Sequence, residues 1–223
     1  MRSGLLLLLG LLLLRPVVAG GEAPAARADA QLRAAAARGD VAGVQDWLAR
    51  GARVEARDEL GRTALLVATQ ANQVGAAALL IGAGADVNAK DALADSPFLY
   101  AGAQGRLAIL RLTLAAGADL KSTNRFGGTA LIPACEKGHL ENVRELLGTK
   151  IDVNHVNRLG WTALMETAMK KNRGPVHAEI TRLLLAAGAN PNLPDHQGVT
   201  PLAHAERAGN QVIAGLLRAA GGK

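Results

Sequence analysis

The stretch GGTALIPACEKGH, residues 127–139, holds the residue types of a nucleophilic site. It places the chain's single cysteine, Cys135, beside Glu136, Lys137 and His139. A cysteine becomes a nucleophile when a neighbouring base or cation lowers the pKa of its thiol. The first question is therefore whether this segment is a reactive thiol with an acid and a base, or part of a scaffold.

Four other stretches of the chain follow the same pattern as this segment. The five stretches begin at residues 61, 94, 127, 160 and 198, so their spacing is 33, 33, 33 and 38 residues. Each has Thr or Ser two places after its first residue, then Ala or Pro and an apolar residue. A second marker, Gly-Ala followed by Asp or Asn, recurs with a similar period at residues 84, 117 and 188. A repeated structural unit explains both markers.

These interleaved motifs resemble those of the ankyrin repeat family, whose units read D-x-x-G-x-T-P-L-x-x-A, then a second helix ending in Leu-Leu, then G-A-D-x-N. The resemblance covers about residues 30–221. It implies an all-α fold, an ankyrin-repeat α-solenoid of about six helix-pair units. Loops resembling β-hairpins, here called fingers, would join the units. Contacts between neighbouring units stabilise such a stack.

The pattern also predicts the domain organisation. We expect a signal peptide at residues 1–19, a flexible segment at 20–29 and the repeat domain at 30–223. The expected units are a cap at 30–57, repeats at 58–90, 91–123, 124–156 and 157–194, and a C-terminal unit at 195–222.

The start of the chain has the pattern of a secretory signal. Leu5–Leu14 is an almost unbroken apolar run that Arg15 ends, and it is shorter than the ~20 apolar residues that span a bilayer. Small residues then lead to Ala19, which suits signal peptidase. We expect cleavage after Ala19, with Ala28 as the second choice and an uncleaved anchor as the alternative. The protein would be periplasmic or secreted, and its resemblance to short exported bacterial ankyrin-repeat proteins implies a bacterial source.

Composition limits the classes of function. One cysteine cannot form an intramolecular disulfide, even in the oxidising compartment that export implies. The formal net charge is +6, and loss of Arg2 and Arg15 with the signal would leave +4. Lys and Arg are scattered along the chain, so the charge does not indicate nucleic-acid binding.

The repeat register reassigns the residues of the opening segment. Cys135 lies six places after Thr129, where other units have mostly small residues, so we expect a small buried core thiol. His139 falls at the turn between two helices, and Glu136 and Lys137 fall on the exposed side of the first helix. The five histidines lack the spacing of a helical metal site. The sequence therefore predicts no enzyme, no cofactor and no metal; a Cys-dependent redox protein would require an exposed Cys135 with a lowered pKa.

The register also predicts local structure. Helix N-caps are expected at Thr63, Ser96, Thr129, Thr162 and Thr200. Left-handed glycines are expected at the ends of second helices (Gly84, Gly117, Gly188) and at the turns between helices (Gly105, Gly138, Gly209).

Three departures from the repeat stand out. Ala94 replaces a finger glycine, and Lys150 replaces a glycine at the end of a second helix. Unit 157–194 carries five extra residues, at 173–177. They form either a tolerated loop or a second contact site.

The fingers carry the candidate binding residues. Leu60, Leu93, Phe126 and Leu159 recur at one finger position, and Gln197 is their equivalent in the last finger. Two fingers combine such a residue with arginine, and one adds a tryptophan, residue types that are enriched at the centres of interfaces. The predicted partner site is Arg125, Phe126, Arg158, Leu159 and Trp161. The alternative is that these side chains pack on one another along the stack.

The sequence therefore predicts a non-catalytic protein-binding module, exported from the cytoplasm, that guards, chaperones or localises a protein partner. The alternative is an inhibitor or immunity protein that blocks an exported enzyme or toxin. We expect a monomer that binds neither nucleic acid nor, after signal cleavage, a membrane.

Overall fold

The computed structural model describes residues 24–169 and 174–223. The expected signal peptide and its cleavage position at Ala19 lie outside these residues, as does part of the insertion. The described residues form twelve α-helices and no strand. The helices are α1 (Pro24–Arg38), α2 (Val41–Ala49), α3 (Ala64–Gln70), α4 (Val74–Gly82), α5 (Pro97–Ala103), α6 (Leu107–Ala115), α7 (Leu131–Lys137), α8 (Leu140–Leu147), α9 (Ala163–Ala168), α10 (Pro175–Ala186), α11 (Pro201–Arg207) and α12 (Gln211–Ala219).

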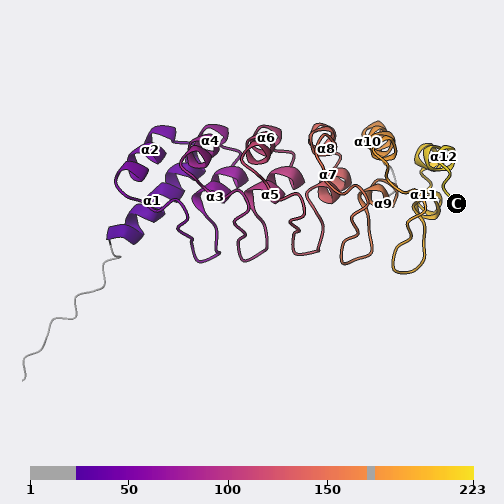
Figure 1. Cartoon of the computed structure of the whole chain (residues 1–223), viewed down its shortest axis with the longest axis horizontal. Helices are drawn as coiled ribbons and strands as arrows, with labels where there is room; N and C mark the ends of the chain where they lie inside the picture. The colour runs from indigo at the N-terminus through magenta and orange to yellow at the C-terminus, as the bar shows by residue number, and fades with distance from the viewer. Residues whose placement is uncertain (1–23, 170–173) are drawn as a thin grey trace, which may run out of the picture.

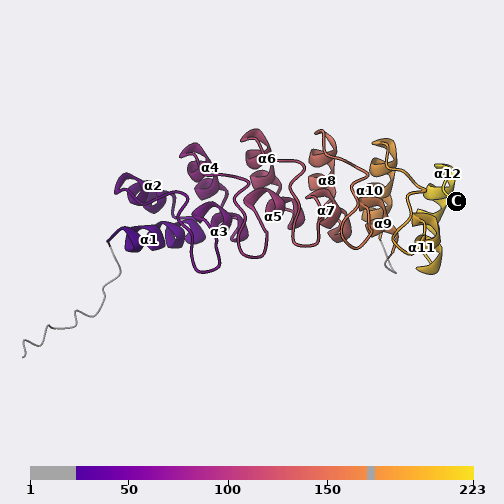
Figure 2. The same cartoon turned by 60° about the horizontal axis from the view of Figure 1, so that its bottom comes forward.

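The helices form two parallel rows. The odd-numbered helices make one row, the even-numbered helices make the other, and the fingers project beyond the odd-numbered row (Figure 1). The two rows and the projecting fingers are also visible after a turn of 60° (Figure 2). Each helix packs on its partner within the unit and on the equivalent helix of the next unit. The result is an elongated all-helical solenoid whose core runs along its length.

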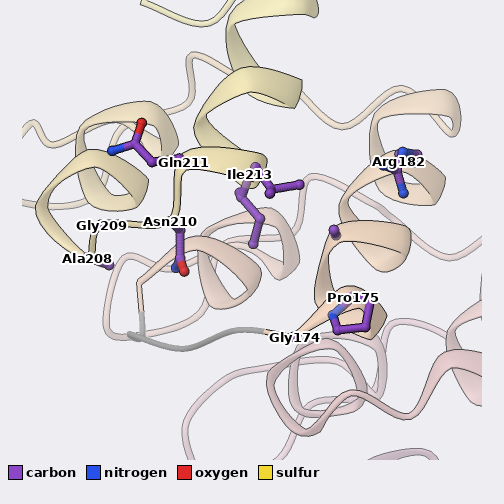
Figure 3. A pocket seen from close by; sticks show the side chains of 10 residues that line it. Gly174, Pro175, Arg182, Ala208, Gly209, Asn210, Gln211 and Ile213 are labelled. Carbon is purple, nitrogen blue, oxygen red and sulfur yellow. The ribbon is translucent and has the colours of Figure 1, made fainter.

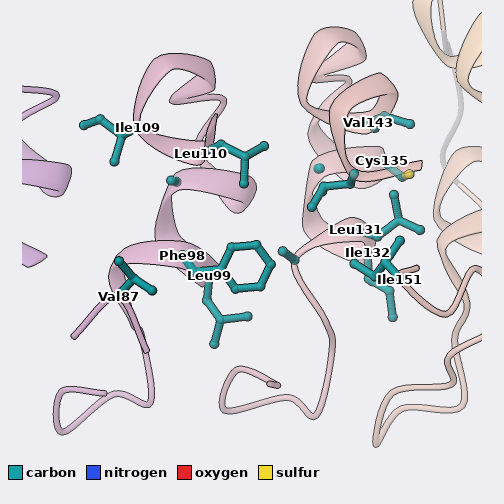
Figure 4. Close-up of a cluster of buried hydrophobic side chains, with 14 of the residues drawn as sticks. Val87, Phe98, Leu99, Ile109, Leu110, Leu131, Ile132, Cys135, Val143 and Ile151 are labelled. Atoms are coloured by element: carbon teal, nitrogen blue, oxygen red, sulfur yellow. The ribbon is translucent and has the colours of Figure 1, made fainter. Parts of the chain in front are cut away.

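The core is made of small and aliphatic side chains shared between units. Phe98 from α5, Leu131 from α7 and Val143 from α8 are almost fully buried in one such layer (Figure 4). The inward-facing leucines predicted in second helices are also confirmed, since Leu80 and Leu146 are fully buried. No unit covers its own apolar face, so the free energy of folding depends on neighbouring units.

Side-chain caps begin four of the five first helices where they were expected. The hydroxyl of Thr63, for example, accepts a hydrogen bond from the Leu66 N–H at 3.2 Å, and Ser96, Thr162 and Thr200 do the same in their units. The prediction is wrong at Thr129. There the helix begins one residue later, Ala130 already has helical dihedrals, and the buried Thr129 hydroxyl has no hydrogen-bond partner.

Left-handed backbone occurs at the positions predicted from glycine. Gly84 at the end of α4 has φ +88°, and Gly105 at the turn between α5 and α6 has φ +68°. Ala94 keeps this conformation without being glycine, with φ +59°. At Lys150 the chain avoids it: the Thr149 hydroxyl instead donates to the Leu146 carbonyl at 2.6 Å and closes the end of α8.

The repeat domain begins earlier than expected. Helix α1 starts at Pro24, so residues 24–29 are helical and are not the flexible segment predicted up to residue 29. Proline suits the first position of a helix, where a backbone N–H would have no partner. Asp29 is buried, and its carboxylate accepts hydrogen bonds from the Arg53 backbone at 2.7 Å and from the Arg53 guanidinium at 2.6 Å. This pair fixes α1 to the first finger loop.

Candidate functional site

Each finger is closed by its leading Asp or Asn. In the third finger, the Asn124 carbonyl oxygen Oδ1 accepts the backbone N–H groups of Phe126 at 2.9 Å and Gly128 at 3.1 Å. In the fourth, Asn157 accepts those of Leu159 and Trp161 in the same way. A backbone bond across the turn completes the finger. The side chains at the tips are therefore presented on a fixed backbone.

The third and fourth fingers are bonded to each other. The Arg158 N–H donates to the Phe126 carbonyl at 2.9 Å, and the Arg158 guanidinium donates to the Arg125 carbonyl at 3.2 Å. The His155 ring lies 2.7 Å from the Gly127 carbonyl. These bonds make the two fingers one platform.

The apolar side chains at the finger tips are exposed to solvent. Phe126 is 49 % exposed and Leu159 is 44 % exposed, and Leu60 and Leu93 are more exposed still. Side chains this open do not chiefly fill the space between fingers. This observation argues against the alternative that the tips pack on one another.

A groove of about 380 Å³ lies between these fingers and the first helices, and we call it the central groove. Its lining comes from the second, third and fourth fingers and from α5, α7 and α9. The lining residues are Asp95, Tyr100, Ala103, Gln104, Asn124, Arg125, Phe126, Gly128, Ile132, Pro133, Glu136, Lys137, Asn157, Leu159, Trp161 and Glu166.

The central groove brings together four of the five predicted site residues. Arg125, Phe126, Leu159 and Trp161 all line it, whereas Arg158 does not. Arg158 instead supports the platform through its bonds to the third finger. Trp161 is partly buried, so it is less open than expected of a tip residue, because it lies where the finger returns to α9.

The first helices add residues that the sequence prediction missed. Tyr100, Pro133 and Glu166 line the groove, and each lies four places after the Thr or Ser of its unit. Their spacing of 33 residues was the signal that could have identified them. Glu136 and Lys137 also line the groove; Lys137 is exposed as expected, but Glu136 is partly buried.

The charges of the groove are arranged around Arg125. Its guanidinium lies over the Phe126 ring at 4.8 Å from the centroid, and it is 3.8 Å from the Asp95 carboxylate. Burial and then the charge of Asp91 raise the pKa of Asp95, although Arg125 and Lys137 act in the opposite direction. The groove therefore holds a carboxylate whose charge is incompletely balanced.

The opening segment is scaffold at its thiol. Cys135 is fully buried beside Leu131 and Val143, and burial followed by the charge of Glu166 raises the pKa of its thiol (Figure 4). A buried thiol with a raised pKa is a poor nucleophile, which contradicts the redox alternative. His139 packs on Gly105, where an added Cβ would lie 2.7 Å from its ring Nδ1. Burial, then the charges of Lys137 and Arg106, lower the pKa of His139.

A second groove, of about 600 Å³, lies at the end of the stack away from the fingers. Gly174, Pro175 and Arg182 form one side of it, and the turn from Gly209 to Ile213 forms the other (Figure 3). The insertion precedes α10 and lengthens it to 12 residues, against 9 in α4. The extra residues thus lie between the helices of their unit, as predicted.

Two searches bear on other kinds of site. Within residues 24–169 and 174–223, no three His, Cys, Asp or Glu side chains are placed to hold a metal ion together. In the same part of the chain, every helix is too short or too polar to cross a bilayer.

Comparisons with known proteins agree with this geometry. Family models described as "Ankyrin repeats (3 copies)" match residues 98–195 and 143–222, and one described as "Ankyrin repeat" matches residues 60–92. A search of curated proteins found no match.

Solved structures of ankyrin repeat proteins resemble the chain. An ankyrin repeat domain from Acinetobacter baumannii AYE is 57 % identical, with a TM-score of 0.83, over 86 % of this chain and 98 % of that one. An ankyrin repeat protein from Enterococcus is 37 % identical, with a TM-score of 0.81, over 85 % and 97 % of the two chains. The ankyrin repeat domain of Bcl-3, a member of the IkappaB family, is 25 % identical, with a TM-score of 0.77, over 86 % of each chain.

Ankyrin repeats are in general protein-interaction modules. The motifs, the paired helices, the family models and the identity to solved ankyrin structures all agree, and the chain therefore belongs to the ankyrin repeat family.

Proposed function

We propose that the protein is an exported, non-catalytic binding module that holds a protein partner in the central groove. The observation that carries this proposal is the convergence of Arg125, Phe126, Leu159 and Trp161 on one groove. The repeat backbone requires none of these residue types at these positions. Aromatic and arginine side chains on a fixed backbone are typical of the centres of protein interfaces.

Export is proposed from the apolar run at Leu5–Leu14. Cleavage after Ala19 would leave α1 complete, because that helix begins at Pro24. Cleavage after Ala28 would remove the first turn of α1. We therefore expect N-terminal sequencing of the mature protein to give a chain beginning at Gly20, and recovery of a soluble protein that keeps Met1 would contradict export.

The binding proposal is tested by capture. The mature chain is immobilised and exposed to the exported fraction of the source cells, in parallel with Trp161→Ala and with Glu59→Gln, which changes a finger outside the groove. We expect the bound protein to be retained by wild type and Glu59→Gln and lost with Trp161→Ala. Equal retention by all three chains would move the partner site away from the central groove.

The captured partner also decides between the roles. If it is an enzyme or toxin whose activity is abolished at a one-to-one ratio, the protein is an inhibitor or immunity protein. If its activity is intact, the protein guards, chaperones or localises it.

A further inference from the structure

The central groove combines aromatic rings with carboxylates. The rings are Tyr100, Phe126 and Trp161, three of the five aromatic residues of the chain. The carboxylates come from three different units: Asp95, Glu136 and Glu166. Aromatic faces and carboxylates both attract cations, and their combination on one surface is the chemistry that recognises an ammonium or a guanidinium group.

The basic side chains of the groove leave part of this surface uncovered. Arg125 lies over the Phe126 ring. Within the described part of the chain, the only other cation stacked on a ring is Arg50, which lies over Trp47 at a distance from the groove. The rings of Tyr100 and Trp161 therefore carry no cation from these residues.

The charge of the groove also differs from that of the chain. Its lining has three acidic side chains and two basic ones, Arg125 and Lys137, whereas the chain as a whole has a formal net charge of +6. The raised pKa of Asp95 agrees with this imbalance, since an additional cation beside it would favour its ionised form. A neutral or acidic side chain would gain nothing from these groups.

We propose that the inner part of the central groove takes a lysine or arginine side chain of the protein partner, between Tyr100 and Trp161 and beside the Asp95 carboxylate. This inference rests on the proposed function and specifies the anchor residue of the partner. Arg125 would then contact the partner around that anchor, at the rim.

Blocked pentapeptides with a single central lysine or arginine between glycines serve as probes for this site. Matched peptides with norleucine or citrulline have a similar size without the charge. The readout is the indole N–H resonance of Trp161 in the full mature chain, with Trp47 as an internal reference. We expect the basic peptides to shift Trp161 but not Trp47, and to bind at least about fivefold more tightly than the neutral peptides.

Asp95→Asn and Tyr100→Leu should each weaken the basic peptides severalfold and leave the neutral ones unchanged, while Glu59→Gln should change neither. Circular dichroism melting checks that each variant is folded, and either folded groove variant suffices for the test. Equal binding of basic and neutral peptides, or no shift of Trp161 by the basic ones, would overturn the inference.

The two proposals fail separately. If the captured partner depends on Trp161 but basic peptides do not bind, only the cation assignment is wrong. If basic peptides bind while partner capture is independent of Trp161, the proposed function is wrong and the cation site stands alone.

Discussion

Ala94 shows how strictly the repeat fixes a backbone conformation. Its φ of +59° matches the left-handed glycines of the other fingers, such as Gly61 at +76°. A side chain there costs about 1–2 kcal/mol relative to the right-handed region. We expect Ala94→Gly to raise the free energy of unfolding by about 1 kcal/mol, measured by chemical denaturation.

The matched control is the reverse change at Gly61. A Cβ on Gly61 would lie 3.2 Å from the Ala92 nitrogen in addition to the left-handed strain, so Gly61→Ala should destabilise the protein. A loss of stability in Ala94→Gly would mean that the second finger does not need this conformation.

Cys135 is expected to be inert in the folded protein. It is fully buried, and its side chain is small, so Cys135→Ala should lower the free energy of unfolding by no more than about 1.5 kcal/mol. In the wild type, a thiol reagent should label Cys135 only as fast as the protein opens. Immediate labelling in native buffer would contradict the buried thiol and restore the redox hypothesis.

The docking of α1 depends on a single ion pair. Asp29 is buried whereas the Arg53 side chain is largely exposed. Burial alone raises the pKa of Asp29, but hydrogen bonds from Arg53 and its charge outweigh this effect and lower that pKa below its usual value. A lowered pKa contributes stability above the unfolded value, and this contribution is lost as the pH falls through the folded value.

We therefore expect Asp29→Asn to cost about 1–2 kcal/mol at neutral pH, towards the lower end because solvent screens Arg53. The difference from wild type should shrink as the pH falls below the usual pKa of aspartate. The control is Asp46→Asn, which removes an exposed pair with Arg50 and should cost almost nothing. Thermal melting across acid pH checks both variants; a constant difference for Asp29→Asn would contradict the role of its charge.

The elements that obey the repeat were predictable, and those that depend on distant contacts were not. The cap at Thr63 and the left-handed turn at Gly105 follow from local chemistry that the register repeats. The start of α1 did not, because its first turn lacks the Thr and Gly signals and is fixed by Arg53, 24 residues away. Thr129 failed as a cap because Gly127-Gly128 begins its unit and the helix starts one residue later.

The whole stack also determines how much of the site could be read from the sequence. The tip residues Phe126 and Leu159 stood out because each interrupts a regular pattern at a known position. The depth of the groove did not, because it is formed by residues from three successive units. Tyr100 and Glu166 become neighbours of the tips only when the helices stack.

The account separates residues that stabilise the stack from residues that bind, and Leu146 represents the first group. Its side chain in α8 is fully buried. Leu146→Ala should lower the free energy of unfolding by about 2–5 kcal/mol through the cavity it leaves. Partner affinity of the folded fraction should be unchanged, since Leu146 does not line the groove.

The most direct test of the central claim is the partner affinity of Phe126→Ala beside that of Leu93→Ala, both measured by calorimetry on proteins whose melting is also recorded. The two residues occupy the same finger position and are similarly exposed, at 49 % and 59 %, but only Phe126 lines the central groove. We predict that Phe126→Ala loses roughly 2 kcal/mol of binding free energy or more, that Leu93→Ala loses almost none, and that both melt close to wild type. Unchanged affinity in Phe126→Ala together with a melting temperature as low as that of Leu146→Ala would show that the tips stabilise the stack and that the partner binds elsewhere.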